Sequence, residues 1–158
     1  MPTSARIRIR DLLARDQPLA DVCAKGWVRT VRRGKEVAFL ELNDGSCLAS
    51  LQVVADPNLS ALADPGLGTG ACISVSGELV PSPASGQRWE LRATCVELLG
   101  GADETYPLQK KRHSLEYLRS IAHLRPRAHT FGALFRLRSA LAFAIHRCFR
   151  ERGFVYVH

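Results

Sequence analysis

The chain lacks any pair of cysteines or histidines at metal-site spacing. Its five cysteines are widely separated and form no CxxC pair, so we expect no zinc site and no other bound metal ion. The five histidines all lie between His113 and His158, again without ligand spacing. An odd number of scattered cysteines also argues against a secreted disulfide scaffold. We therefore expect each cysteine to be a small buried residue in a reducing compartment.

The chain also lacks targeting and membrane signals. No apolar run approaches the roughly 20 residues that a membrane span needs. The N-terminus is basic, but no apolar segment follows it as in a signal peptide. The glycines of GLGTG at 66–70 do not have the GxGxxG spacing, and they do not predict a phosphate-binding loop. These absences favour a cytoplasmic protein without a membrane partner.

The composition indicates a folded, basic protein. With 158 residues, 46% of them hydrophobic, the chain is long enough for one domain, or for one small domain and a piece of another. The net charge of +7 and the pI of about 9.6 favour an anionic partner. Residues 1–104 hold 11 Lys and Arg against 13 Asp and Glu, whereas residues 105–158 hold 11 against 2. The basic excess therefore lies in the tail.

Residues 25–54 (KGWVRTVRRGKEVAFLELNDGSCLASLQVV) predict three consecutive β-strands. The strands are expected at 27–31, 37–42 and 48–54, where β-branched and aromatic residues gather. Asn43-Asp44-Gly45 predicts a tight turn between the second and third strands, because these residue types tolerate positive φ.

The next segment predicts a short helix and two more strands. Asn58 is expected to cap a helix at 59–63, and alternating sequences predict strands at 71–80 and 89–99. Five strands, with a short helix between the third and fourth, are the order of an OB-fold barrel. We therefore expect a mainly β fold built on a closed five-stranded barrel.

The second strand presents a candidate surface for unpaired bases. Phe39 alternates with Leu40 and Leu42, so its ring is expected to point outward. An aromatic ring, the nearby cations Arg29 and Arg32, and an amide, Gln52, are the groups that hold single-stranded nucleic acid on a sheet.

The residues alone leave other interpretations of this surface open. Phe39 could be a core residue, and the basic segment could be the solvated turn of an ordinary hairpin. Trp27 and Trp89 are expected to pack or to lie at the rim of the barrel.

The C-terminal part of the chain predicts a long apolar helix. The helix is expected at 131–152, with Thr130 as its N-cap and a left-handed Gly153 after its end. A strand is expected at Phe154–Val157. Apolar residues cover more than one side of this helix, and no other predicted element could bury them. The tail therefore indicates part of a further domain.

Four motifs carry a family resemblance. They are GWVRT at 26–30, FLELNDGSC at 39–47, YPLQKKRH at 106–113 and IAHLRPR at 121–127. On these motifs the chain resembles the N-terminal part of asparaginyl-tRNA synthetases, in the class II group shared with the aspartyl and lysyl enzymes. The resemblance implies an OB-fold anticodon-binding domain at 1–102, a linker or hinge at 103–130, and the start of a class II catalytic domain, with an incomplete motif 1, at 131–158.

The resemblance also implies roles for individual residues. An aromatic at the position of Phe39 stacks on the middle anticodon base, a uridine, and residues at Arg32 and Gln52 contact that base. An acidic residue at Glu90 acts on a neighbouring base, although a salt-bridged surface acid is the alternative interpretation. Arg29 is included with this anticodon-binding set.

For the tail, the resemblance implies a homodimer interface on motif 1, expected at Phe135, Leu141, Ile145 and Phe149. The family joins asparagine to its tRNA with ATP and Mg²⁺, in motifs expected beyond His158. We therefore expect no catalytic residue and no bound cofactor in this chain, and no ligase activity from it alone. An aspartyl- or lysyl-type fragment, a stand-alone binder of single-stranded nucleic acid and a self-associating structural fragment remain alternatives.

Overall fold

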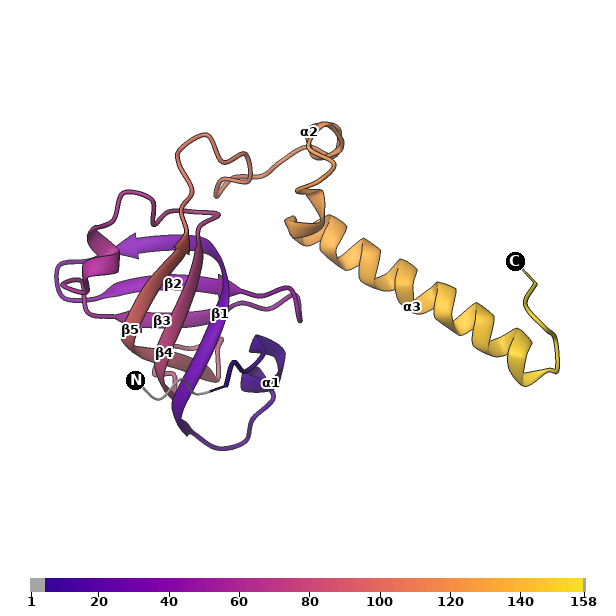
Figure 1. The fold of residues 1–158 in the computed structure, drawn as a ribbon, viewed down its shortest axis with the longest axis horizontal. Helices are drawn as coiled ribbons and strands as arrows, with labels where there is room; N and C mark the ends of the chain where they lie inside the picture. Colours follow the sequence, from indigo (N-terminus) through magenta and orange to yellow (C-terminus); the bar gives the residue numbers. More distant parts are fainter. Residues whose placement is uncertain (1–4, 158) are drawn as a thin grey trace. The chain divides into compact units, whose positions relative to one another are not determined.

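A computed structural model describes residues 5–157 of the chain (Figure 1). The chain divides into two compact units, the first ending at Arg112 and the second beginning at His113. Among residues 5–157, no helix has both the length and the apolar character needed to cross a membrane.

The first unit is a closed five-stranded barrel with the strand order β1-β2-β3-β5-β4. Strands β3 and β5 pair in parallel, and every other neighbouring pair is antiparallel. This arrangement confirms the OB-fold expected from the sequence. The elements are β1 (Leu19–Arg33), β2 (Ala38–Asn43), β3 (Leu51–Ala55), η1 (Ser60–Ala63), β4 (Cys72–Pro81) and β5 (Trp89–Gly100).

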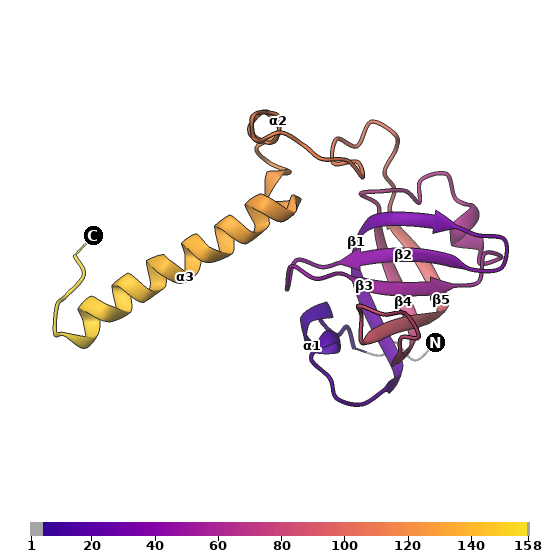
Figure 2. The ribbon, with the colours of Figure 1, turned by 180° about the vertical axis from the view of Figure 1, so that it is seen from behind.

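Strand β1 belongs to both sides of the barrel. Its first half pairs with β4 and its second half with β2, and Trp27 is opposite Asn43 on one side and Cys72 on the other. Figure 2 shows β1, β2 and β3 side by side. The strand begins at Leu19, well before the start expected from the sequence, because the segment before Trp27 pairs with β4.

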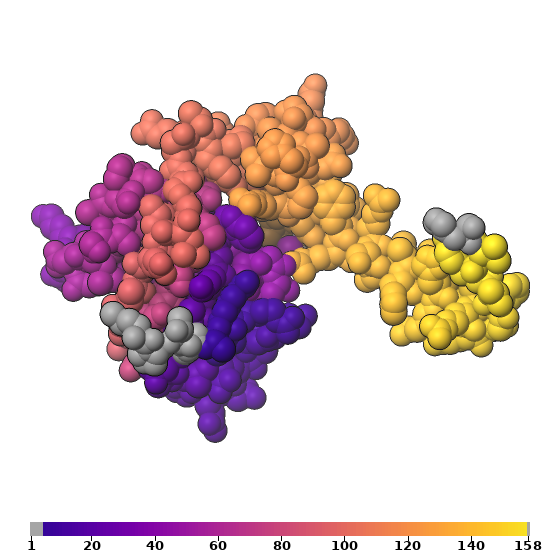
Figure 3. Space-filling view, viewed as in Figure 1, coloured from indigo at the N-terminus to yellow at the C-terminus, as the bar shows by residue number. Residues whose placement is uncertain are grey.

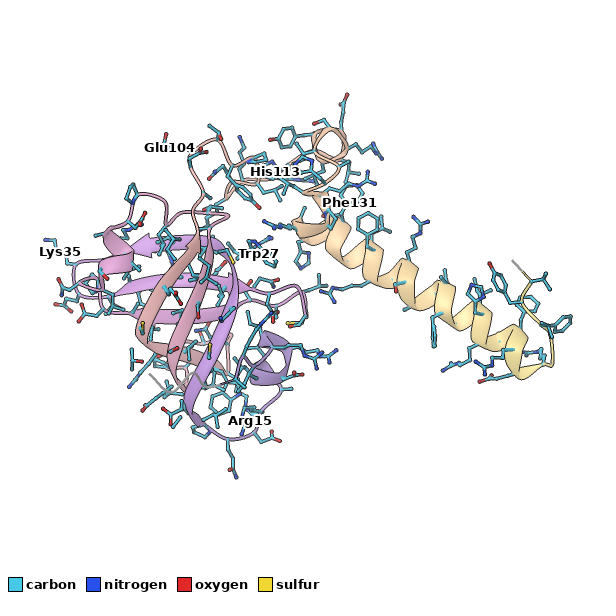
Figure 4. The ribbon with its side chains drawn as sticks, in the orientation of Figure 1. Arg15, Trp27, Lys35, Glu104, His113 and Phe131 are labelled. Carbon is cyan, nitrogen blue, oxygen red and sulfur yellow. The ribbon has the colours of Figure 1, made fainter. Side chains whose placement is uncertain are left out.

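The barrel core is closed at one end by the short helix α1 (Ile9–Leu13), whose Ile9 and Leu12 side chains are fully buried. Trp89 is also buried, which confirms that it packs against the barrel. Its indole Nε1 donates to the carbonyl of Arg15 at 3.0 Å (Arg15 is labelled in Figure 4). The strands contribute alternate apolar side chains: Val22, Ala24, Val28, Ala38, Leu40, Leu42, Leu51, Val53, Ile73, Val75, Leu79 and Leu91.

The β2–β3 connection is a folded loop, so the tight turn predicted at Asn43–Gly45 is wrong. Strand β3 begins only at Leu51. The Asn43 side-chain amide donates to the Ala49 carbonyl at 2.8 Å, which holds the two ends of the loop together. The Asp44 carboxylate accepts the backbone N–H of Ile9 at 3.0 Å. These polar side chains fold the segment against α1 instead of reversing it within two residues.

The Asp44 carboxylate links this loop to the first turn of α1, and we expect it to stabilise the barrel at neutral pH. Burial alone would raise its pKa, but hydrogen bonds from Ser46 and Ile9, with the Arg6 guanidinium, lower the pKa below the ordinary value. A lowered folded-state pKa contributes stability above the unfolded-state pKa, which is lost as the pH falls. We expect Asp44→Asn to lower the free energy of unfolding by about 1.5–3 kcal/mol at neutral pH, which is the contribution of a hydrogen bond to a charged group.

The measurement is urea unfolding of the chain and of Asp44→Asn. The difference in unfolding free energy should shrink when the pH is taken below about 4, where the unfolded-state carboxyl is protonated. A difference that stays constant from neutral to acidic pH would contradict a role for the charge.

Two local predictions from the sequence are also wrong. The short helix η1 has Leu59 at its N-cap position and no side-chain cap, and the Asn58 side-chain amide donates to Asp56. The cysteines are not uniformly buried: Cys23 is buried, but Cys95 and Cys148 are exposed. Cys95 and the preceding Thr94 are both exposed, where the pairing of β5 with β4 shifts register, an irregularity that composition alone does not reveal.

The second unit contains α2 (Leu115–Ser120), η2 (Arg125–Arg127) and α3 (His129–Glu151). Helix α3 confirms the predicted long helix, but it starts after Ala128, so Thr130 lies inside the helix and is not its N-cap. Gly153 has φ 82°, as expected for a left-handed cap. The Phe154 N–H donates back to the Phe149 carbonyl at 3.1 Å, and the two rings meet edge to face.

This cap turns the chain back along α3, and the strand predicted at Phe154–Val157 is wrong. Residues 154–157 are irregular, and Tyr156 packs edge-on against His146. Figure 3 shows the C-terminal residues, in yellow, gathered at the end of the second unit. A β-strand needs a hydrogen-bonded neighbour, and the described residues of this unit offer none.

Candidate nucleic-acid interface

The outward face of the barrel carries a row of side chains centred on Phe39. Neighbouring positions across β1, β2, β3 and β5 are Arg32, Phe39, Val54 and Arg92. Phe39 is half-buried between the buried Ala38 and Leu40, which confirms that its ring points away from the core. The Arg32 guanidinium carbon lies 5.5 Å from the centroid of the Phe39 ring, a cation–π contact.

A second row lies two residues along the same strands. It contains Thr30, Glu41, Gln52 and Glu90, in register across β1, β2, β3 and β5. The half-buried Gln52 lies between the buried Leu51 and Val53, so its outward orientation is also confirmed. Two residues of strand separate the rows by about 7 Å, roughly the span of a base.

The two rows differ in charge and in hydrogen-bonding chemistry. The Phe39 row is basic, with Arg32 and Arg92 at its ends, and its ring offers a stacking face to any base. In the second row an amide lies between two carboxylates. An amide both donates and accepts hydrogen bonds, whereas a carboxylate only accepts them, so this row suits the polar edge of a base better than a phosphate.

Glu90 is not the surface acid considered as an alternative. It is only 5% exposed, and Ser82 Oγ donates to its Oε2 at 3.2 Å. Its Oε1 lies 3.8 Å from Arg92 Nε. The carboxylate is therefore held between the β4–β5 loop and the basic row.

The comparisons with known proteins agree with this geometry. A family model described as "OB-fold nucleic acid binding domain" matches residues 22–99. The asparagine–tRNA ligase of Geobacter metallireducens is 65% identical over 156 residues, which cover 98% of this chain and 34% of the relative. The asparagine–tRNA ligase of Geobacter sulfurreducens is 64% identical over 154 residues, which cover 97% of this chain and 33% of the relative. Over nearly its whole length the chain matches the N-terminal portion of asparaginyl-tRNA synthetases. It spans about a third of the length of these curated relatives.

Solved structures of asparaginyl-tRNA synthetases share the fold. The enzyme from Pyrococcus horikoshii superimposes with a TM-score of 0.82 at 20% identity, over 97% of this chain and 37% of that one. The enzyme from Entamoeba histolytica superimposes with a TM-score of 0.77 at 20% identity, over 100% of this chain and 38% of that one. At this identity the likeness supports the fold alone.

Arg29 is the one anticodon candidate that the structure leaves outside the two rows. It lies between Val28 and Thr30, where the pairing of β1 with β2 shifts register. Arg33, at the end of the same strand, stabilises the fold. Its guanidinium donates to the Leu62 and Leu67 carbonyls at 3.3 and 2.7 Å. Lys35 lies beyond the strand in the β1–β2 loop, away from Trp27 (Figure 4).

Sequence reasoning missed three contributors to this surface. Arg92 and Val54 complete the Phe39 row, and Ser82 contacts Glu90 from the neighbouring loop. Alternation from Glu90 would have placed Arg92 on the outer face. The contact of Ser82 needed the loop conformation, for which the sequence gives no periodic signal.

In the second unit, three of the four predicted interface residues are exposed. Leu141, Ile145 and Phe149 are 59%, 50% and 54% exposed. Phe135 is half-buried, since it packs on Phe131 with the Arg125 guanidinium against both rings (Figure 4 labels Phe131).

Proposed function

We propose that this chain supplies the tRNA anticodon-binding part of an asparagine–tRNA ligase. The observation that carries the proposal is the pair of rows on one barrel face, with Phe39 and Arg32 in one and Gln52 and Glu90 in the other. The identity of 65% to a named asparagine–tRNA ligase supports the assignment to asparagine over aspartate or lysine.

In the proposed complex, the middle uridine of the anticodon stacks on the Phe39 ring. Stacking of this kind contributes about 1–3 kcal/mol per base. The uracil edge carries one N–H donor between two carbonyl acceptors, so the Gln52 amide can both accept from it and donate to it. Arg32 leaves the ring face and donates to a carbonyl or a phosphate oxygen. Glu90 accepts hydrogen bonds from a neighbouring base, and Arg29 contributes positive charge.

The whole-protein activity that follows is ATP-dependent attachment of asparagine to its tRNA in the cytoplasm. We assign residues 1–102 to anticodon binding, 103–130 to a hinge, and 131–158 to the start of the catalytic domain. Residues 5–157 hold no group of three or more His, Cys, Asp or Glu side chains arranged for a metal ion. We propose that ATP and Mg²⁺ are bound by the other two-thirds of the family's length.

The experiment is fluorescence anisotropy of the chain with an asparagine-tRNA anticodon stem-loop, at fixed salt because phosphate contacts make affinity salt-dependent. The comparison is the same stem-loop with the middle uridine changed to cytidine. We expect clear preference for uridine. Equal binding to both loops would identify a general single-stranded nucleic-acid binder, and no binding to either would favour a structural fragment.

We also propose that α3 forms a homodimer interface. Leu141, Ile145 and Phe149 repeat every four residues, so they share one exposed side of the helix. We expect Ile145→Asp to convert dimers to monomers in analytical ultracentrifugation, because a charge would have to be buried. Ser139→Asp, which adds the same charge on another side of α3, should leave the dimer intact. Monomers of the unaltered chain at every concentration would contradict the proposal.

A further inference from the structure

The β4–β5 loop, residues 82–88, carries a hydrogen-bond network that ends on Glu90. Gln87 Nε2 donates to Ser82 Oγ at 2.9 Å, and the Ala84 backbone N–H donates to the same oxygen at 3.2 Å. Ser82 Oγ in turn donates to Glu90 Oε2 at 3.2 Å. The loop is closed at its base, where the Ser82 N–H donates to the Arg88 carbonyl at 3.0 Å.

The direction of this network is fixed by the chemistry of a hydroxyl group. A serine hydroxyl has two acceptor lone pairs and one hydrogen to donate. Gln87 and Ala84 fill both lone pairs, so the single hydrogen of Ser82 is directed to Glu90. The network therefore holds Oε2 and fixes the plane of the carboxylate.

The other carboxylate oxygen remains available. Glu90 Oε1 accepts no hydrogen bond among the described residues, and its nearest cation is Arg92 Nε at 3.8 Å, beyond hydrogen-bonding distance. Among residues 5–157, Arg15 Nε is the one buried side-chain nitrogen or oxygen without a hydrogen-bond partner, so Glu90 Oε1 is still reached by solvent. A bound N–H donor can take the place of that water.

We propose that Ser82, held by Gln87, is a positioning residue that presents Glu90 Oε1 to a base next to the uridine on Phe39. This inference rests on the proposed anticodon-binding function. An acceptor-only group selects a base edge that is rich in N–H donors, and guanine has two adjacent donors on its pairing edge. The asparagine codons AAU and AAC pair with the anticodon GUU, which places a guanine beside the middle uridine.

The test compares two affinity ratios for the full 158-residue chain. One is guanine over adenine at the first anticodon position, and the other is uridine over cytidine at the middle position. In Ser82→Ala we expect the guanine preference to fall by about tenfold, the order of one hydrogen bond to a charged group, with the uridine preference unchanged. Ser82→Thr, which keeps the hydroxyl, should restore the guanine preference. Ser85→Ala, in the same loop and exposed, is the matched control.

Gln87→Glu is a second, nearly isosteric test. It replaces the donor at Ser82 Oγ by an acceptor, so the Ser82 hydrogen is drawn away from Glu90. We expect the same loss of guanine preference as in Ser82→Ala. The double variant should show no further loss, because both changes remove the same hydrogen bond from Ser82 to Glu90. This variant carries the test if Ser82→Ala does not fold.

Three outcomes would overturn the inference. In the first, folded Ser82→Ala and Gln87→Glu keep the full guanine preference, and anticodon binding stands without this network. In the second, both ratios fall together, which indicates a structural role for Ser82. In the third, the unaltered chain prefers neither uridine nor guanine, and the proposed function fails as well.

Discussion

Phe39→Ala is expected to weaken binding of the anticodon stem-loop by about 5- to 150-fold and to remove the preference for uridine at its middle position. The range corresponds to the roughly 1–3 kcal/mol that stacking on one aromatic side chain contributes. Phe39 is the one aromatic side chain in the two rows. Its loss leaves Gln52 with its hydrogen-bonding groups but without a surface that holds the base beside them.

The measurement is anisotropy with the uridine and cytidine loops at one salt concentration, and two further variants isolate the cause. Phe39→Tyr keeps the ring and should retain most of the affinity, whereas Phe39→Leu keeps apolar contact without a π-face and should behave like Phe39→Ala. The Phe39 ring is not part of the core cluster, so each variant is expected to unfold at the same midpoint as the unaltered chain. That midpoint is measured for each variant, so that a loss of affinity is not mistaken for a loss of folding. Equal affinities for Phe39→Leu and the unaltered chain would show that the ring does not stack.

The sequence predicted those parts of the fold that depend on periodicity. Alternation placed Phe39 and Gln52 outward, because each lies between buried neighbours on a strand with one solvent face. The helical pattern of α3 and the left-handed Gly153 are local signals of the same kind. Such signals come from the geometry of a single element, so they can be recognised without the rest of the chain.

Asp44 and Glu90 have partners that are distant in sequence, and for them the sequence was misleading or undecided. Asp44 was assigned to a tight turn, but its carboxylate accepts from Ile9, 35 residues earlier. Glu90 lies on β5, and its buried carboxylate accepts a hydrogen bond from Ser82, which lies on the β4–β5 loop. Family resemblance named Glu90 as a site residue without giving its surroundings. Only the closed barrel brings these groups together.

Gly77 is the position where this dependence on distant partners should have its largest effect on stability. It lies inside β4, where the pairing with β5 shifts register between Ser76 and Gly77. A Cβ at Gly77 would collide with the Arg92 carbonyl oxygen and lie 3.0 Å from the Ala93 Cα, both backbone atoms that cannot rotate away. Glycine is found in strands where another backbone approaches this closely.

Gly77→Ala is therefore expected to lower the unfolding free energy by about 3 kcal/mol or more, the upper end of the cost of overpacking. That is a large share of the roughly 5–15 kcal/mol of a typical domain. The measurement is urea unfolding, with Gly100→Ala as the matched control, because a Cβ at Gly100 meets only the Cys72 side chain at 3.9 Å. An unchanged midpoint for Gly77→Ala would show that β5 can move aside at Arg92. Any Gly77→Ala that does fold must have displaced the segment between Glu90 and Arg92, so it should also bind the stem-loop more weakly than Gly100→Ala.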